Sequence, residues 1–368
     1  MYAISDDSRP KHDPRLGWAR PATPVLRRRR DGILPTLAAA LSQPGAGTLT
    51  ATAHRSGPAP QPHPLVRAVL ESLGSDRSER HAGRCPETVL ISRRITEAGA
   101  RTVQEARAAL RRARITTRHI REEGDPRHGA YARHCHVCTT LLAHFGLRSV
   151  APSSEATTAL RLPTGGARGT AGGGAAAPAA PAGAGRWPER PDRAAVEAER
   201  WSRELAAHRS PLGHRHTVTP AARAAWAEYG GLRLLPTGPG AVHVPVPVVL
   251  DPMLGRHWPR TLGDLGRALG TVLSPLGATG LPADGAGAGA RAGDGDGDEA
   301  GCDGALLAVD REGRVYCLDH SGDWFLGPDV RSALTVLLTG ARPHRLGPPP
   351  GPPGDARDGA AGGPAEAR

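Results

Sequence analysis

Three cysteines and one glutamate are the residues of this chain whose types and spacing could do chemistry together. Cys85 and Glu87 stand two positions apart at the start of a predicted helix, and Cys135 and Cys138 open another, fifty residues after Cys85. Three thiolates can fill three of the four tetrahedral positions around Zn²⁺, and a nearby carboxylate can move protons to and from a water in the fourth. A ligand-x-Glu followed by Cys-x-x-Cys is typical of zinc-dependent deaminases that act on nucleobases.

The position of each thiol on its predicted helix favours a shared metal ion. Residues three apart in a first helical turn point to one side, so Cys135 and Cys138 can be bridged. Cys85 begins a helix, where the positive end of the dipole favours a thiolate. Glu87 is too close to Cys85 along the chain to chelate the same ion comfortably. We therefore predict Cys85, Cys135 and Cys138 as Zn²⁺ ligands and Glu87 as the catalytic acid and base.

Two other interpretations of the cysteines stay open. A closed structural zinc site would have a fourth protein ligand and no water to activate, and Glu87 would then be a surface residue of its helix. A redox role for Cys135 and Cys138 is the third possibility, but it leaves Cys85 and Glu87 unexplained. Cys302, Cys317 and His63 fit none of these patterns, and we expect them to be inert. The histidines near the second thiol pair that could close a structural site are His128, His134, His136 and His144.

Length and composition limit the architecture that the chain can form. The 368 residues are enough for two ordinary domains, and the 48 Gly and 36 Pro indicate extensive linkers. Five cysteines in a chain of this length do not make a disulfide framework. Residues 1–150 carry a net charge of +12 and the remainder a net charge of −1. A basic surface suits a polyanionic substrate, although a solvated arginine-rich face explains the same charge.

Composition shifts along the chain predict five segments. Helix and strand patterns alternate through residues 33–151, which predicts an α/β domain. A second structured stretch covers residues 189–346, and its proline-containing strand over Val242–Leu250 is expected at a sheet edge. The remaining segments are expected to be unstructured: a basic tail over residues 1–32 with a solvated arginine run (Arg27–Arg30), a Gly/Ala/Pro linker over 152–188, and a tail over 347–368.

Several functions are excluded by what the sequence lacks. The first residues show no charged-then-apolar leader and no stretch is long enough to span a membrane, so we expect a cytoplasmic protein without a membrane partner. The acidic Asp294–Asp298 stretch suggests calcium at first sight. An EF-hand loop would need Gly at its sixth position and Glu at its twelfth, where this chain has Glu299 and Ala305. A solvated loop explains the stretch instead.

Residues 33–150 resemble the YwqJ-like branch of the cytidine-deaminase superfamily. The resemblance implies an α/β/α three-layer deaminase fold, with Cys85, Cys135 and Cys138 on zinc and Glu87 as the proton shuttle. It also implies a toxin-type deaminase of a polymorphic toxin system, in a family whose substrates are largely undefined. From the chemistry of the site we expect the substrate to be cytosine or adenine, in a nucleotide or a single-stranded nucleic acid. Two positions depart from the family pattern: Arg133-His134 stands where Pro usually precedes the Cys-x-x-Cys, and Pro86 stands where Ala is common. The resemblance is carried by Gly83–Glu87, Ile115–Arg118, Gly124–Gly129 and Cys135–Gly146.

Residues 189–346 are similar to the SUKH superfamily of immunity proteins, most closely its third subgroup. This resemblance implies an α+β binding module with a mainly antiparallel sheet, which neutralises toxins by contact and performs no chemistry. The stretches that carry it are Gly213–His216, Trp226–Leu232, Leu262–Gly270 and Val315–Gly327.

The two resemblances together predict a toxin-type zinc deaminase fused to an immunity-type domain. A flexible linker of about 25 residues spans roughly 25–30 Å and gives a millimolar effective concentration, so even a weak contact between the domains would form. We expect the second domain either to restrain the first through this intramolecular contact or to bind a related toxin partner. The alternative is a non-enzymatic immunity or decoy protein with a structural zinc in a degenerate deaminase fold.

Overall fold

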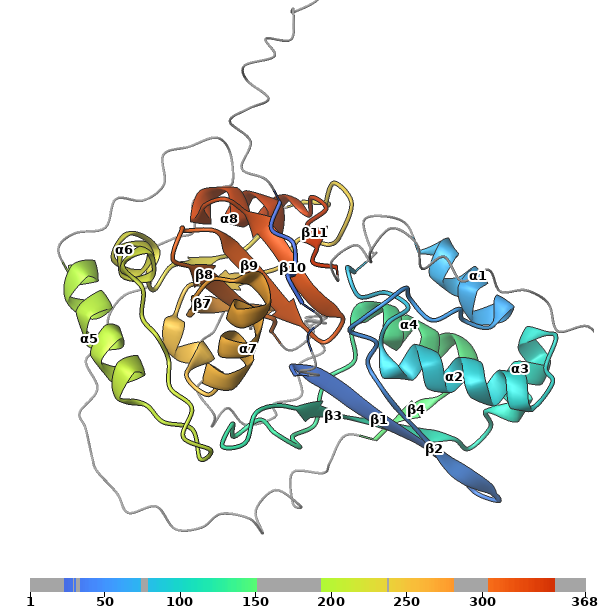
Figure 1. Ribbon diagram of the computed structural model, residues 1–368. Helices are drawn as coiled ribbons and strands as arrows, with labels where there is room; N and C mark the ends of the chain where they lie inside the picture. Colours follow the sequence, from blue (N-terminus) through green and yellow to red (C-terminus); the bar gives the residue numbers. More distant parts are fainter. Residues whose placement is uncertain are drawn as a thin grey trace, which may run out of the picture.

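The computed structural model describes residues 23–28, 30, 34–73, 79–150, 193–236, 238–280 and 304–347. Two parts lie side by side in Figure 1, each with its own sheet and helices. We call them the N-terminal region (residues 34–150) and the C-terminal region (residues 193–347). The predicted linker, the acidic loop with Cys302 and most of both predicted tails fall outside the described residues.

The N-terminal region is a four-stranded sheet with four helices. The strands lie in the order β2-β1-β3-β4, and only the pair β3–β4 is parallel. The predicted hairpin is formed by β1 and β2, with Gly45 at a positive φ of 78° in its turn. The elements are β1 (Thr36–Gln43), β2 (Ala46–Thr52), α1 (Pro64–Ser72), α2 (Pro86–Glu97), α3 (Val103–Ala109), β3 (Arg114–Ile120), α4 (His136–Phe145) and β4 (Arg148–Ser149).

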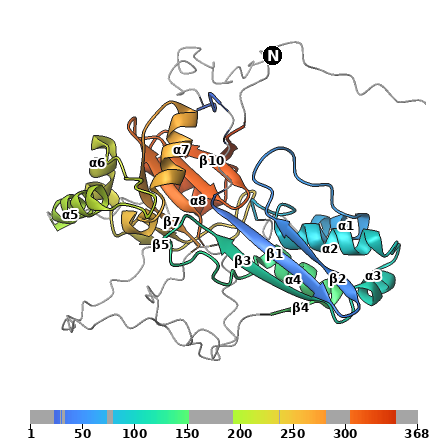
Figure 2. The same ribbon diagram turned by 60° about the horizontal axis from the view of Figure 1, so that its bottom comes forward.

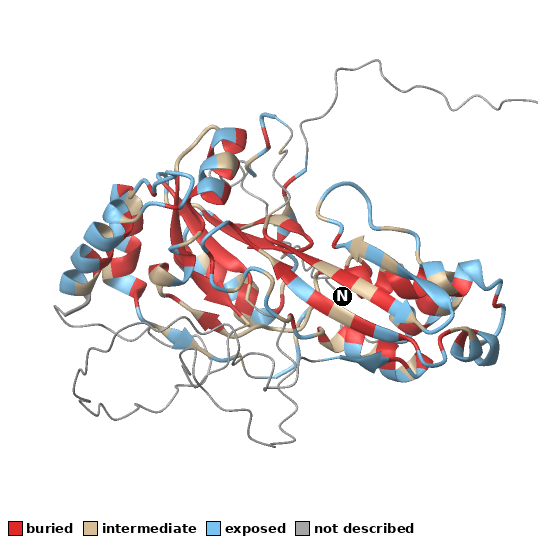
Figure 3. Ribbon diagram, turned by 90° about the horizontal axis from the view of Figure 1, so that it is seen from below, coloured by how far each residue is buried: buried red, intermediate tan, exposed pale blue. Residues whose placement is uncertain are grey.

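One face of this sheet is packed against the helices. Along β3, Ile115, Thr117 and His119 are buried, whereas Thr116 and Arg118 between them are more exposed, as the two-residue period of a strand requires. Along β1, the buried residues Leu37, Ala39 and Leu41 likewise alternate with less buried ones. Figure 3 shows buried and less buried residues alternating along the strands of the N-terminal region. The described helices of the N-terminal region lie over the buried face in Figure 1. The predicted α/β class of this region is confirmed.

The C-terminal region is built on a seven-stranded sheet in the order β11-β10-β9-β8-β7-β6-β5, antiparallel at every pairing. This confirms the predicted α+β class with its antiparallel sheet. The elements are α5 (Arg193–Ala207), α6 (Pro220–Tyr229), β5 (Arg233–Leu234), β6 (Val248–Val249), a 3₁₀ turn η4 (Pro252–Gly255), α7 (Pro259–Leu269), β7 (Leu273–Thr279), β8 (Leu306–Asp310), β9 (Val315–Asp319), β10 (Gly322–Gly327), α8 (Val330–Thr339) and β11 (His344–Arg345).

Strands β8 and β9 are buried on both faces because helices cover both sides of this sheet. Leu307 and Cys317 face one core, which is completed by side chains of α5, α6 and α8. Leu306 and Leu318 face the opposite core, which is completed by α7. A strand covered on two sides shows no alternation of polar and apolar residues, which explains the continuous apolar runs of β8 and β9.

Two expectations from the sequence are wrong. The Val242–Leu250 segment forms only the two-residue strand β6, which lies between β5 and β7 and not at the sheet edge. Its prolines precede the paired residues and therefore remove no hydrogen bond from the ladder. The expectation of a solvated arginine run is wrong for Arg30, whose side chain is 6% exposed in ion pairs with Asp264 and Asp323, although Arg27 and Arg28 are exposed. Leu26, just before the run, is buried against α7.

The two regions contact each other directly. Figure 2 shows the ends of β1 and β3 reaching the C-terminal region. The indole N–H of Trp258 donates to Asp125 over 2.9 Å, and the Arg121 guanidinium lies 5.4 Å from the Trp258 ring centroid. These interactions join the two regions. No helix among the described residues is long and apolar enough to span a membrane.

Candidate metal centre

The three predicted thiols converge between the starts of two helices. Cys85 is the N-cap residue of α2, and Cys135 is the N-cap residue of α4, whose first turn holds Cys138. Their sulfur atoms all lie within 4.8 Å of one another, and Cys85 Sγ is 3.9 Å from Cys135 Sγ. All three side chains are buried, and none forms a disulfide.

Local backbone geometry points these sulfurs at one another. Cys135 Sγ accepts a hydrogen bond from the backbone N–H of Cys138 over 3.3 Å, which holds it against the first turn of α4. Pro86 occupies the first position of α2, where its fixed φ suits a helix start, so the chain enters α2 directly after Cys85. The positive ends of two helix dipoles meet at the cluster and favour negative sulfur there.

Glu87 is buried beside the thiols and is not a surface residue. Its side chain is 2% exposed, and Oε1 accepts hydrogen bonds from Thr117 Oγ1 and His134 Nδ1, each over 2.8 Å. Its other oxygen, Oε2, lies 3.6 Å from Cys138 Sγ. The carboxylate is therefore held by β3 and by the segment before α4, with one oxygen directed toward the cluster.

The histidines that sequence analysis offered as a fourth ligand do not lie at the thiols. Among the described residues, the groups close enough to share an ion contain none of these four. His134 binds Glu87 and Ser149, and His128 pairs through Nδ1 with the backbone of Arg121. The imidazoles that do lie at the cluster belong to other positions. The groups are His81, Cys85 and His320; Cys85, Cys135 and Cys138; and Glu79, His81 and Cys135.

His320 reaches the cluster from the C-terminal region. It occupies the turn between β9 and β10, and its Nε2 lies 3.5 Å from Cys85 Sγ. Its ring centroid is 4.4 Å from that of His81. Sequence reasoning missed both histidines. His81 could have been suspected from its His-x-x-x-Cys spacing to Cys85, but His320 stands 235 positions from Cys85 with no pattern linking them.

The buried setting controls the charge of each group. Hydrogen bonds with the other thiols, together with burial, raise the pKa of the Cys85 thiol well above its ordinary value. Burial opposes charge on His81, but Glu79 and Cys135 outweigh it and raise the His81 pKa well above normal. Burial and the neighbouring His81 lower the pKa of His320 to about 3, so the His320 ring is neutral at pH 7.

This donor set fits a metal ion. Sulfurs at 2.3 Å from a tetrahedral Zn²⁺ are about 3.8 Å apart, close to the observed 3.9 Å between Cys85 and Cys135. Buried thiols resist ionisation next to one another, and a cation between them removes that resistance. Sulfur and imidazole nitrogen are ligands that bind zinc in preference to the hard cations Mg²⁺ and Ca²⁺.

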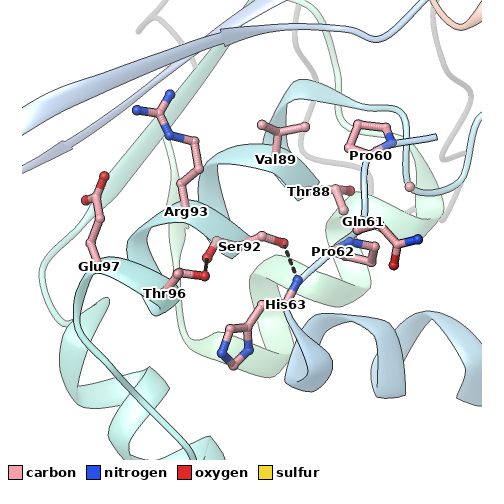
Figure 4. A pocket seen from close by; sticks show the side chains of 11 residues that line it. Pro60, Gln61, Pro62, His63, Thr88, Val89, Ser92, Arg93, Thr96 and Glu97 are labelled. Atoms are coloured by element: carbon pink, nitrogen blue, oxygen red, sulfur yellow. Dashed lines mark hydrogen bonds between the residues drawn. The ribbon is translucent and has the colours of Figure 1, made fainter. Parts of the chain in front are cut away.

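Very little space is left at the cluster. The cavity there is about 10 Å³, near the minimum that one water needs, and is lined by residues that include Cys85, Glu87, Cys135 and His320. A larger cavity of about 340 Å³ lies between α2 and the segment before α1, where Ser92 Oγ accepts the backbone N–H of His63 (Figure 4). None of the three thiols lines this larger cavity.

Comparison with known families agrees with the two-region architecture. Residues 23–147 match the family model of YwqJ-like deaminases, and residues 180–281 and 298–340 match that of SUKH-3 immunity proteins. Neither the curated proteins nor the solved structures give a match. The N-terminal region is therefore similar to YwqJ-like deaminases and the C-terminal region to SUKH-3 immunity proteins, which matches the fusion predicted from the sequence.

Proposed function

We propose that the N-terminal region is a zinc-dependent hydrolytic deaminase of nucleobases, of toxin type, carried with an immunity region in one chain. One observation carries the proposal: three buried sulfurs converge beside a buried carboxylate, inside a region that matches a deaminase family. A carboxylate in this position is suited to the proton transfers of deamination.

In the proposed reaction Cys85, Cys135 and Cys138 hold the zinc. When bound, the ion supplies a nucleophile by lowering the pKa of a water to about 7. Glu87 would take a proton from the attacking water and give it to the ring nitrogen of the base as the oxygen adds to the amine-bearing carbon. Glu87 would then take the remaining proton of the added hydroxyl group and give it to the departing amine, so that the carbon–nitrogen bond breaks and ammonia leaves a carbonyl behind.

Thr117 and His134 position the proton shuttle. Both donate to the same oxygen of Glu87, which fixes the plane of the carboxylate and leaves the second oxygen on the side of the cluster. A catalytic carboxylate fixed by buried partners in this way loses little orientational entropy in the reaction.

An arginine-lined surface supports a polyanionic substrate such as a single-stranded nucleic acid. A cavity of about 950 Å³ lies at the end of the N-terminal region where α3, β3 and the end of α4 meet. No acidic side chain lines it. Clustered arginines attract phosphates regardless of base sequence, so this surface favours neither cytosine nor adenine. The lining arginines are Arg107, Arg111, Arg112, Arg114 and Arg148.

The position of His320 favours a second candidate function. A fourth protein ligand would close the zinc site, and the chain would then be a non-enzymatic immunity or decoy protein with a structural zinc. The buried carboxylate of Glu87 argues for the enzyme, because a purely structural site has no use for a buried acid with two hydrogen-bond donors.

The test is a Glu87→Gln variant of the full chain, with Glu97→Gln, an exposed residue of the same helix, as its control. Both proteins are offered cytidine, adenosine, their nucleotides and single-stranded oligonucleotides, and the release of ammonia and the deaminated base are measured. We expect Glu87→Gln to keep its metal and lose activity by about 10²–10⁴-fold, with Glu97→Gln unaffected. Equal, measurable activity of the two variants contradicts the enzyme, and so does the absence of product from any substrate when the chain also carries His320→Ala.

A further inference from the structure

We propose that His320 is the fourth protein ligand of the metal, donated by the SUKH-3 region to close the deaminase site of its own chain. The inference rests on the proposed metal centre and adds its regulation. The sequence suggested that one domain restrains the other, but it did not identify the residues that do so. The structure identifies His320 as the residue of the C-terminal region that contacts Cys85.

The distances at Cys85 agree with coordination, and Cys85 is the residue shared by the three-cysteine group and the group that holds His81 and His320. A sulfur at 2.3 Å and an imidazole nitrogen at about 2.05 Å from one tetrahedral zinc are about 3.5 Å apart. Cys85 Sγ and His320 Nε2 are 3.5 Å apart, and the sulfurs of Cys85 and Cys135 are 3.9 Å apart. The Nε2 atom of His320 is the ring nitrogen that faces Cys85 Sγ, as a ligand of the same ion must.

The turn that carries His320 has a fixed shape. The Asp319 carboxylate accepts the backbone N–H of Ser321 over 2.8 Å, its hydroxyl over 2.6 Å, and the backbone N–H of Gly322 over 3.0 Å. These bonds close the turn around His320. The Asp319 carboxylate also faces the Arg80 guanidinium of the N-terminal region over 3.7 Å, which ties the turn to the loop before α2.

Arginines hold the same turn against the N-terminal region. The Arg55 guanidinium donates to Asp323 over 2.7 Å and to the backbone carbonyl of Asp319 over 2.6 Å. Arg30, which precedes the N-terminal region in sequence, pairs with the other oxygen of Asp323. Arg345 of the C-terminal region donates to Ser321 O over 2.9 Å and also to Arg55 O. His320 therefore lies on a turn that hydrogen bonds and ion pairs hold from both sides.

The contact leaves no room for a substrate. Pockets for small ligands are about 300–1,000 Å³, whereas the cavity among Cys85, Glu87, Cys135 and His320 is about 10 Å³. A nucleobase can reach the sulfurs only after the turn has moved away. Coordination by His320 would thus occupy the position on the metal that a water needs. The turn that carries His320 would cover the access of a substrate to the cluster.

Cobalt substitution of the full chain tests this inference without relying on activity, because the visible d–d absorption of Co²⁺ reports its ligands. We expect His320→Ala to shift this absorption and to weaken zinc binding by at least about tenfold, and added azide to change the spectrum of the variant but not that of the native chain. Imidazole added to the variant should restore the native spectrum, which shows that the protein is folded. His344→Ala, an exposed histidine of the same region, is the control and should behave like the native chain.

The outcomes separate the inference from the proposed function. A native spectrum in His320→Ala, or an azide response already present in the native chain, overturns the coordination by His320 whatever the activity. A shifted spectrum together with a deamination rate that rises at least about tenfold, as expected for an opened site, supports both proposals. A shifted spectrum with no deamination of any substrate keeps the closed metal centre and removes the enzyme.

Discussion

At the scale of single residues, the orientation of Glu87 depends on partners that sequence spacing did not indicate. Thr117 lies on the buried face of β3 and donates its hydroxyl to Glu87, whereas Thr116 next to it faces outward. We expect Thr117→Val to lower the free energy of unfolding by about 1–2 kcal/mol, because a buried carboxylate loses a donor. Thr116→Val should be neutral or slightly stabilising in urea denaturation. Equal effects of the two changes would show that the hydrogen bond does not hold Glu87.

His216 makes the stability of the C-terminal region sensitive to acid. Burial lowers its pKa to about 4, and its Nε2 donates to the carbonyl of Arg256 over 2.8 Å. The folded ring stays neutral where the unfolded ring takes up a proton, so stability is complete above about pH 6.5 and is lost as the pH falls toward 4. Between about pH 7.5 and pH 5 we expect a loss of about 2 kcal/mol from this group.

Substitution of His216 isolates this contribution from the other histidines. In His216→Gln the amide can still donate to the Arg256 carbonyl but does not titrate. Urea denaturation of the native chain and the variant at both pH values should therefore show a smaller acid loss in the variant, by about 2 kcal/mol. An identical loss in both proteins would assign the pH dependence to other groups.

The candidate site was predictable as far as it is local. Cys135 and Cys138 share one helical turn and Cys85 precedes another, so their types and spacing were enough to single them out. The imidazole that lies beside Cys85 was not predictable in this way. His320 meets Cys85 through a contact between two sheets, and neither the helical nor the strand period connects residues so far apart.

At the scale of elements, helices were easier to predict than strands. Proline at the first helical position marked the starts of α1, α2 and α6, and the positive-φ glycines Gly146 and Gly340 marked the ends of α4 and α8. Strand β7 was not predicted because its sequence contains serine, proline and glycine. It is fully buried because β6 and β8 pair with its two edges and helices cover the sheet, so tertiary packing decides its conformation.

Helix α7 depends on the other region for its N-terminal cap. Its own N-cap residue, Trp258, makes no side-chain capping bond. Glu122 of the N-terminal region instead accepts the backbone N–H groups of Arg260 over 3.2 Å and Thr261 over 2.6 Å. A carboxylate there satisfies free donors and complements the helix dipole. We expect Glu122→Ala to lower the free energy of unfolding by about 1–2 kcal/mol.

The neighbouring residue provides a matched control for this cap. Glu123 is exposed and carries the same charge, so Glu123→Ala changes the net charge equally without removing the cap. Denaturant unfolding of the two variants, followed by circular dichroism, compares them directly. A similar loss in both would mean that the charge of the loop matters and the cap does not.

At the scale of the whole molecule, the uneven charge of the sequence has a structural counterpart. The basic half places Arg30, Arg55 and Arg80 against the carboxylates of Asp319 and Asp323 in the near-neutral half. These arginines therefore form ion pairs at the boundary between the regions and are not free to bind a polyanionic partner. The five arginines around the cavity beside α3 are at the other end of the N-terminal region and stay exposed.

Asp323 is the residue on which this boundary depends most, because it pairs with two arginines whose side chains are at most 9% exposed. Removing its charge leaves the buried Arg55 guanidinium without its ion-pair partner and Arg30 with Asp264 alone, at a cost of about 3 kcal/mol. We expect Asp323→Asn to loosen the regions, so that amide hydrogen exchange in the turn that carries His320 becomes faster while exchange within α2 and α4 is unchanged. Glu197→Gln, which removes the carboxylate of an exposed pair with Arg200, should leave exchange in this turn as it is. Unchanged protection of the turn in Asp323→Asn would mean that the packing around His320, and not the arginine pairs, keeps the two regions together.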